Sequence, residues 1–129
     1  MEYGQIHHVE YYVNNLASSS AFWNWFSPQL GYKEFQKWDG GISYAHKNGT
    51  YLVFVQVQDE FLSHKNTRQG NGLNHIAFMG GSVKQLSELV KQLEERNIKI
   101  LINREDYLCF EDPNQFAIEV YAKKNEDLC

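Results

Sequence analysis

The sequence has little of what three large classes of protein depend on. No apolar run in its 129 residues approaches the ~20 residues that a membrane-spanning helix needs. Its 12 lysines and arginines are outnumbered by 16 acidic residues, so a net charge of −4 offers no basic surface to a nucleic-acid backbone. With only two cysteines, Cys109 and Cys129, a disulfide-stabilised scaffold is not expected.

The composition that remains is typical of one folded domain in the cytoplasm. A chain of this length, with 43% hydrophobic residues, can bury a substantial core. The opening segment Met1–Gln5 is polar and lacks the basic and apolar regions of a signal peptide. Cys109 lies in an apolar segment and is expected to be a buried thiol, which suits a reducing compartment. We therefore expect a cytoplasmic protein with no nucleic-acid or membrane partner.

The chain carries two similar halves in tandem, and each half begins with a histidine in an apolar strand. The segment Ile6–Tyr11 aligns with Leu73–Phe78. This alignment places His8 opposite His75. A residue type that recurs at matching positions of two repeats points to a shared role for both copies.

A second match occurs near the end of each half, where a polar residue interrupts an apolar strand. Phe54–Val57 aligns with Ala117–Val120, and this alignment places Gln56 opposite Glu119. Each half would thus open on a histidine and close on an amide or a carboxylate.

Hydrophobic periodicity predicts the same order of elements in both halves: strand, helix, then three strands. In the first half these are a strand at 6–13, a helix over 22–26 after the capping serines 18–20, and strands at 32–37, 42–46 and 51–57. In the second half they are a strand at 73–79, a helix over 83–93, and strands at 98–102, 107–110 and 116–122. We predict one α+β domain over 1–129, built from two tandem βαβββ modules at about 5–58 and 72–123, with a polar linker at about 59–71.

The paired positions His8, Gln56, His75 and Glu119 suit a divalent metal ion. Imidazole nitrogen with carboxylate and amide oxygen is a donor set for Zn, Ni, Mn or Fe. Taken singly, each side chain could simply lie on the wet face of a half-exposed strand. Their matched placement in both repeats favours a shared metal site.

Four stretches of the sequence together resemble one superfamily. They are His8-Val9 with Val13 and Leu16, the segment Ala21–Tyr32, the segment Gly72–Phe78, and the segment Phe110–Glu119. With them the chain resembles the vicinal oxygen chelate superfamily: glyoxalase I, bleomycin-resistance proteins, fosfomycin-resistance thiol transferases and extradiol dioxygenases. The resemblance implies that the strands curl into an open, incomplete barrel around a metal-centred cavity. It also implies a metal held by His8, Gln56, His75 and Glu119.

The resemblance implies a glyoxalase-like metalloenzyme of the lyase or isomerase type. The metal would bind vicinal oxygens of a small substrate and stabilise an enediolate or alkoxide, with Glu119 as general base. Tyr12 stands where glyoxalase I carries a basic residue, so little activity on glutathione adducts is expected. A homodimer is expected, because an incomplete barrel leaves strand edges that a partner can cover.

Two other functions fit the same superfamily. One is a metal-free antibiotic-binding resistance protein, against which the retained His8, His75 and Glu119 argue. The other is a thiol transferase of the fosfomycin-resistance type, which needs cationic groups for a phosphonate. The strands near Glu119 show no motif rich in lysine or arginine.

Overall fold

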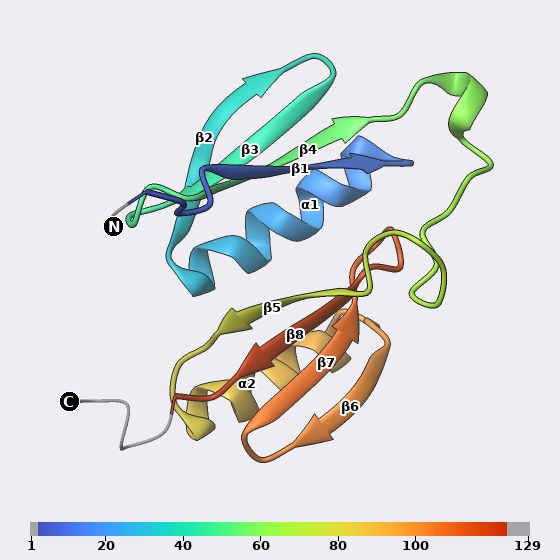
Figure 1. Cartoon of the computed structure of the whole chain (residues 1–129). Coiled ribbons are helices and arrows are strands. Elements are labelled where there is room, and N and C mark those ends of the chain that lie inside the picture. The colour runs from blue at the N-terminus through green and yellow to red at the C-terminus, as the bar shows by residue number, and fades with distance from the viewer. Residues whose placement is uncertain (1–2, 124–129) are drawn as a thin grey trace. The chain divides into compact units, whose positions relative to one another are not determined.

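Each half of the chain forms one βαβββ unit (Figure 1). The computed structural model describes residues 3–123, and the boundary between its two units falls between Lys65 and Asn66. This boundary lies inside the segment predicted as a linker. Within residues 3–123, no helix combines the length and the apolar character that crossing a membrane needs. Cys129 lies outside the described residues.

The first unit is a four-stranded sheet with one long helix. Its elements are β1 (His8–Val13), α1 (Leu16–Phe26), the 3-10 helix η1 (Ser27–Leu30), β2 (Tyr32–Trp38), β3 (Gly41–His46), β4 (Tyr51–Gln56) and the 3-10 helix η2 (Asp59–Phe61). The strand order is β1-β4-β3-β2; β1 runs parallel to β4 and the other neighbours are antiparallel.

The second unit repeats this topology. Its elements are β5 (His75–Met79), α2 (Val83–Glu95), β6 (Ile100–Arg104), β7 (Tyr107–Glu111) and β8 (Ala117–Tyr121). The order is β5-β8-β7-β6, again with one parallel pair, β5 and β8. The predicted α+β class with two tandem βαβββ modules is confirmed.

In each unit the helix covers one face of the sheet. In the first unit the Trp23 ring of α1 stacks on Phe54 of β4 with ring centroids 4.8 Å apart, and both side chains are fully buried. In the second unit Leu93 of α2 is buried, as are Leu108 and Ile118 of the sheet. Because side chains alternate along a strand, every second residue points to the other face. We call this second face, away from the unit's own helix, the open face.

The beginnings of the two helices differ from each other in how they are capped. Helix α2 begins with a capping box between Ser82 and Gln85, and Ser82 was predicted as its cap. Helix α1 begins earlier than predicted: its cap is Asn15, whose side chain accepts a hydrogen bond from Ser18 N at 3.1 Å. The serines predicted to precede the helix lie inside it, and Ser19 is fully buried there.

Candidate metal site

His8 lies at the start of β1, on the open face of the first unit. Its partner in the parallel ladder is Tyr51, and the two rings stack with centroids 4.8 Å apart. Along β1, the exposed side chains His8, Glu10 and Tyr12 alternate with the more buried Val9. The His8 Nδ1 atom lies 2.8 Å from His7 Nδ1. The Nε2 atom of His8 is therefore the ring nitrogen left to face a ligand.

Gln56 lies on the opposite face of the same sheet from His8. Its Oε1 atom accepts a hydrogen bond from Leu16 N at 2.8 Å, and its Nε2 atom donates to Asn14 O at 2.8 Å. Leu16 is the first residue of α1, so the amide satisfies a backbone donor that a helix leaves unpaired at its start. Gln56 thus fastens the start of the helix to β4.

The ladder also separates Gln56 from His8 along the strands. Tyr51 lies opposite His8 and Gln56 lies opposite Val13, at the other end of β1. At about 3.3 Å per residue this separation is roughly 16 Å. This spacing does not suit joint coordination of one metal by His8 and Gln56 of this unit, so Gln56 is left out of the ligand set proposed below.

The strand registers of the two units show that Gln56 and Glu119 do not occupy corresponding positions. In the second unit His75 pairs with Ala117, and Ala77, two residues later, pairs with Glu119. In the first unit the residue two positions after His8 is Glu10, which pairs with Val53. The structural counterpart of Glu119 is thus the buried Val53, three positions before Gln56. A shift by an odd number of residues moves a side chain to the opposite face.

We expect the Gln56 amide to matter to stability. Replacing Gln56 with alanine should lower the free energy of unfolding by about 1–2 kcal/mol, because it removes the acceptor of the part-buried Leu16 N at the start of α1. Urea unfolding measures this loss, with Gln58→Ala as the exposed control. An unchanged unfolding free energy, or a loss of bound metal in Gln56→Ala, would contradict this assignment.

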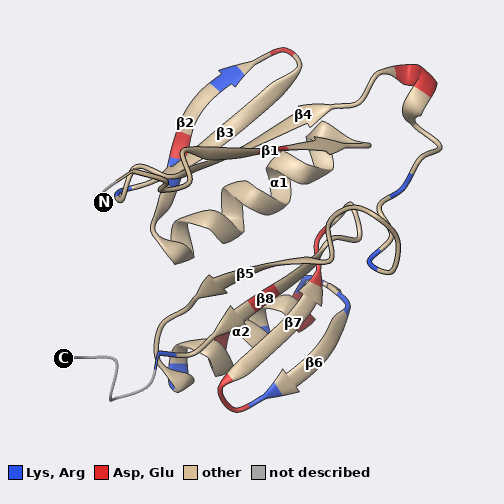
Figure 2. Cartoon of the chain, in the orientation of Figure 1, with Lys and Arg blue, Asp and Glu red and all other residues tan. Residues whose placement is uncertain are grey.

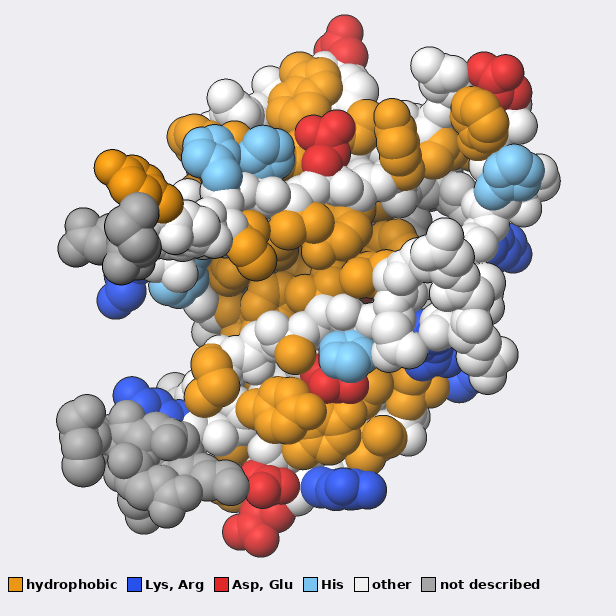
Figure 3. All heavy atoms as spheres, viewed as in Figure 1, with side chains coloured by type: hydrophobic (Ala, Val, Ile, Leu, Met, Phe, Trp, Pro, Cys, Tyr) orange, Lys and Arg blue, Asp and Glu red, His pale blue; other side chains and the backbone are white. Residues whose placement is uncertain are grey.

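His75 and Glu119 do come together, on the open face of the second unit. The His75 Nε2 atom lies 3.4 Å from Glu119 Oε1. The imidazole is 40% exposed and the carboxylate only 12%, so the pair has one accessible side and one protected side. In the space-filling view a histidine side chain lies against an acidic one, with hydrophobic side chains around them (Figure 3).

Asn74 orients the His75 ring, a role that sequence reasoning missed. The Asn74 Nδ2 atom donates to Arg68 O at 3.0 Å, which leaves Asn74 Oδ1 facing His75 Nδ1 at 2.6 Å. Since Oδ1 is an acceptor, the proton of the neutral ring lies on Nδ1. The Nε2 atom then carries the lone pair and points it at Glu119. Metal-binding histidines in proteins are commonly oriented by such a hydrogen bond.

Two phenols hold the carboxylate of Glu119. Tyr121 donates to Glu119 Oε1 at 3.1 Å, and Tyr107 also hydrogen-bonds to this carboxylate. The bond to Glu119 raises the pKa of the Tyr121 phenol; burial first, and then the bond to Glu119, raises the pKa of Tyr107. Both phenols therefore stay protonated and act as donors to this carboxylate.

Two acceptor atoms meet between His75 and Glu119 when the imidazole is neutral, and a bound cation would satisfy both. In the neutral ring, His75 Nε2 and Glu119 Oε1 are both acceptors, and they face each other at 3.4 Å. Nitrogen and carboxylate oxygen together suit a borderline divalent metal. Within residues 3–123, no group of three or more His, Cys, Asp or Glu side chains gathers in one place. The pair by itself offers two donor atoms, and His8 occupies the corresponding histidine position on the open face of the first unit.

Comparison with known proteins gives consistent matches over most of the chain. A family model described as the Glyoxalase/Bleomycin resistance protein/Dioxygenase superfamily matches residues 5–120. An uncharacterized protein of Bacillus subtilis (strain 168), YqjT, is 38% identical over 126 residues, which cover 91% of this chain and 98% of that protein.

Solved structures match as well. The crystal structure of a candidate glyoxalase from Bacillus halodurans has a TM-score of 0.87 and 39% identity, covering 94% of this chain and 97% of that one. The E126Q mutant of the fosfomycin resistance protein FosX from Listeria monocytogenes has a TM-score of 0.69 and 16% identity, covering 98% of this chain and 95% of that one. FosX is complexed there with Mn(II) and 1S,2S-dihydroxypropylphosphonic acid. At this identity the likeness to FosX concerns the fold.

Proposed function

Because the chain belongs to the Glyoxalase/Bleomycin resistance protein/Dioxygenase superfamily, we propose that it is a metal-dependent, glyoxalase-like enzyme acting on a small substrate with vicinal oxygens. The observation that carries this proposal is the pair of His75 and Glu119, with Asn74 directing the imidazole lone pair toward the carboxylate.

The metal would be held by His8, His75 and Glu119. Gln56 is left out, because both ends of its amide are bonded at the start of α1. A divalent ion of Zn, Ni, Mn or Fe suits these donors. When bound, it would act as a Lewis acid on the two oxygens of the substrate.

The chain's own residues would handle the proton. Glu119 is the proposed general base, since its carboxylate is the acidic group that lies 3.4 Å from His75 Nε2 on the open face. Tyr121 and Tyr107 hold that carboxylate in place through hydrogen bonds. Tyr12 is 66% exposed on the open face of the first unit and brings no charge. A substrate other than a glutathione adduct therefore remains our expectation.

Metal binding tests this proposal directly. Purified protein without a histidine tag, dialysed against each of the four ions in turn, should retain one of them and lose it to a chelator. Retention of none of them would remove the proposed enzyme and favour a metal-free binding protein.

The hydrogen bond from Asn74 gives a sharper prediction. Asn74→Leu should weaken metal binding by about 10- to 100-fold, as expected when the partner that orients a ligand histidine is removed. Competition with a metallochromic indicator measures the affinity. Asn48→Leu, in an exposed turn, serves as the control. Unchanged affinity in Asn74→Leu would mean that His75 needs no orienting partner or is not a ligand.

We also propose that the protein is a cytoplasmic homodimer. β1 and β5 each end their own sheet, so each has one edge without a strand partner in that sheet. Such edges favour pairing with another strand. Sedimentation at micromolar concentrations should give twice the 15.1 kDa of one chain. A monomer across that range would contradict the dimer and leave the metal site untouched.

A further inference from the structure

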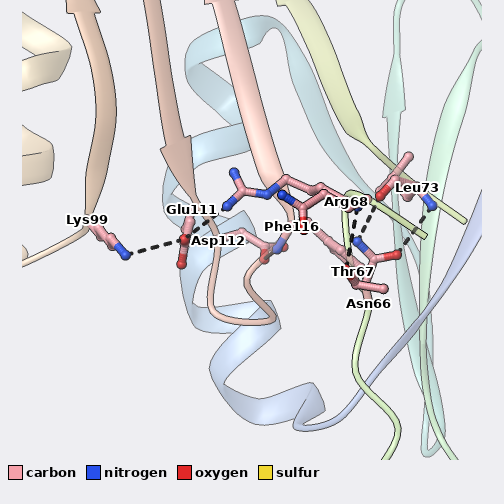
Figure 4. A network of polar contacts seen from close by, with 9 residues as sticks. Asn66, Thr67, Arg68, Leu73, Lys99, Glu111, Asp112 and Phe116 are labelled. Carbon is pink, nitrogen blue, oxygen red and sulfur yellow. Dashed lines mark hydrogen bonds and ion pairs between the residues drawn. The ribbon is translucent and has the colours of Figure 1, made fainter.

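The chain leading into β5 is held as a closed loop by side-chain hydrogen bonds. Asn66 Nδ2 donates to Leu73 O at 2.8 Å, and Leu73 N donates to Asn66 Oδ1 at 3.3 Å (Figure 4). Within this loop the carbonyl oxygen of Arg68 accepts the bond from Asn74 described above. The backbone of Arg68 is thus fixed to the residue that orients His75, while its side chain extends away from the loop.

The Arg68 side chain extends toward Glu111 at the end of β7. The Arg68 Nη2 atom lies 3.8 Å from Glu111 Oε1, and Lys99 Nζ lies 3.9 Å from the same oxygen. Arg68 approaches from the β5 side and Lys99 from the β6 side (Figure 4). Both distances exceed the ~2.7–2.9 Å of a charge-assisted hydrogen bond. Two cations share one carboxylate, so the positive charge here is only partly neutralised and the donors of Arg68 are not locked.

The ladders place this positive charge beside the candidate metal ligand. Glu111 pairs with Ala117, and Ala117 pairs with His75, so the three lie in one row across the open face. With strands about 4.8 Å apart, His75 and Glu111 are on the order of 10 Å apart. Between them the sheet carries only the small side chain of Ala117. Ala117 is only 3% exposed, whereas the His75 side chain is 40% exposed and the Arg68 side chain, beside Glu111, is 39% exposed. These two accessible groups at the ends of the row are the ones that a small molecule held at His75 would meet.

The register of β7 and β8 places Glu111 on the same face as Glu119. Cys109 is the cross-strand partner of Glu119, and Glu111 lies two residues further along β7. The carboxylate that Arg68 approaches therefore lies on the open face, next to the proposed ligands. The basic segments on the chain before β5 and the acidic ones on β7 and β8 can be followed in Figure 2.

We propose that Arg68 is a specificity-determining residue, whose guanidinium binds an oxyanion at the far end of the substrate. The substrate class would then be a small molecule with vicinal oxygens at one end and a carboxylate or phosphate at the other. A guanidinium presents paired donors that match such oxyanions. This inference rests on the proposed function, because His75 and Glu119 are assigned there to the oxygen-binding end. A purely structural role for Arg68 is a poor alternative, because its Nη2 atom lies 3.8 Å from Glu111 Oε1, beyond hydrogen-bond distance, and Lys99 stays beside this oxygen when Arg68 is replaced.

Three probes that share one chelating end test the proposal on manganese-loaded protein. Lactate has only the 2-hydroxy acid end, 2-hydroxyglutarate adds a distal carboxylate, and 3-phosphoglycerate adds a distal phosphate. Calorimetric titration of wild type should show at least one of the two anionic probes binding about tenfold or more tightly than lactate. Arg68→Gln should reduce this ratio to within about twofold, and Arg68→Lys should restore only part of it. Tighter binding of 2-hydroxyglutarate would identify a carboxylate as the distal group, and tighter binding of 3-phosphoglycerate would identify a phosphate.

Lys99→Gln is the matched control, because it removes a cation from the same Glu111 oxygen, and Lys99 directly precedes β6, at the opposite edge of the sheet from His75 on β5. It should keep the wild-type ratio. Equal affinities for all three probes in wild type, no binding of any probe, or a ratio that survives Arg68→Gln would each overturn the assignment. Metal content measured on the same samples separates this failure from failure of the proposed function. Chelator-treated protein should still bind inorganic phosphate or succinate more tightly in wild type than in Arg68→Gln.

Discussion

Replacing His75 with alanine should abolish stoichiometric metal binding, the largest single effect we expect. The variant loses the Nε2 lone pair that Asn74 directs toward Glu119, and a site with one fewer nitrogen ligand competes poorly with water. The fold should persist, because the His75 side chain is 40% exposed and fills no core position. Elemental analysis after dialysis against Mn(II), together with circular dichroism, measures both outcomes.

His64→Ala is the matched control for this experiment. His64 is an exposed histidine in the segment after η2 and contacts the Phe61 ring rather than the sheet. It should retain the wild-type metal content. His8→Ala should lose metal as His75→Ala does. Wild-type metal content in both His8→Ala and His75→Ala would contradict the proposed ligand set.

Replacing Glu119 with glutamine should lower kcat by about 100-fold or more while leaving the fold intact. A general base contributes about 10²–10⁴ to the rate of a proton transfer, and an amide cannot take that role. Glutamine keeps the shape of the side chain and an oxygen that can accept the hydrogen bond from Tyr121. Thermal unfolding should therefore change little, and much of the metal should remain bound.

The kcat comparison uses any substrate that the wild-type protein turns over, with Glu94→Gln on the exposed side of α2 as the control. The control also removes one negative charge, but from α2 and not from β5 or β8, which carry His75 and Glu119. If Glu119→Gln keeps a near-normal kcat, the proton passes to another group, and Glu119 is at most a metal ligand.

The topology of the fold could be predicted from the sequence, because the spacing of apolar residues identifies most of the helices and strands, and their order recurs in both halves. The three- and four-residue spacing of Leu86, Leu89, Val90 and Leu93 identifies α2, and these four side chains are buried. The start of helix α1 could not be predicted from the same kind of pattern. Three consecutive serines suggested a cap, whereas Asn15 caps the helix and small side chains such as Ser19 pack inside it.

The candidate site could be predicted only in part, because strand register is not written in local sequence. Phe54–Val57 and Ala117–Val120 share the same apolar and polar pattern, so aligning them seemed to match Gln56 with Glu119. Hydrogen bonding between β1 and β4 sets the true correspondence, which is Val53. The alternation of apolar and polar residues along a strand does not show which face each residue occupies. The hydrogen-bonded register of β1 with β4 is therefore needed to see that Gln56 is three residues away from the counterpart of Glu119.

The supporting residues depend on contacts across strands and loops. Asn74 precedes His75 in sequence, and an amide beside a candidate ligand could have marked it as an orienting group. Arg68 and Tyr121 gave no such signal. Arg68 reaches Glu111 from a loop, and Tyr121 reaches Glu119 from two residues further along the same strand. Their roles follow from side-chain direction, which the sequence pattern alone does not specify.

The most direct test of the central claim is anomalous scattering from a crystal of the manganese-loaded protein, recorded near the manganese absorption edge. We predict one peak per chain within about 2.0–2.3 Å of His75 Nε2 and of a Glu119 carboxylate oxygen. A His8 Nε2 atom should complete the histidine pair, and Gln56 should remain bonded at the start of α1. A peak bonded to Gln56, or a fully loaded protein whose metal contacts neither His75 nor Glu119, would contradict the account.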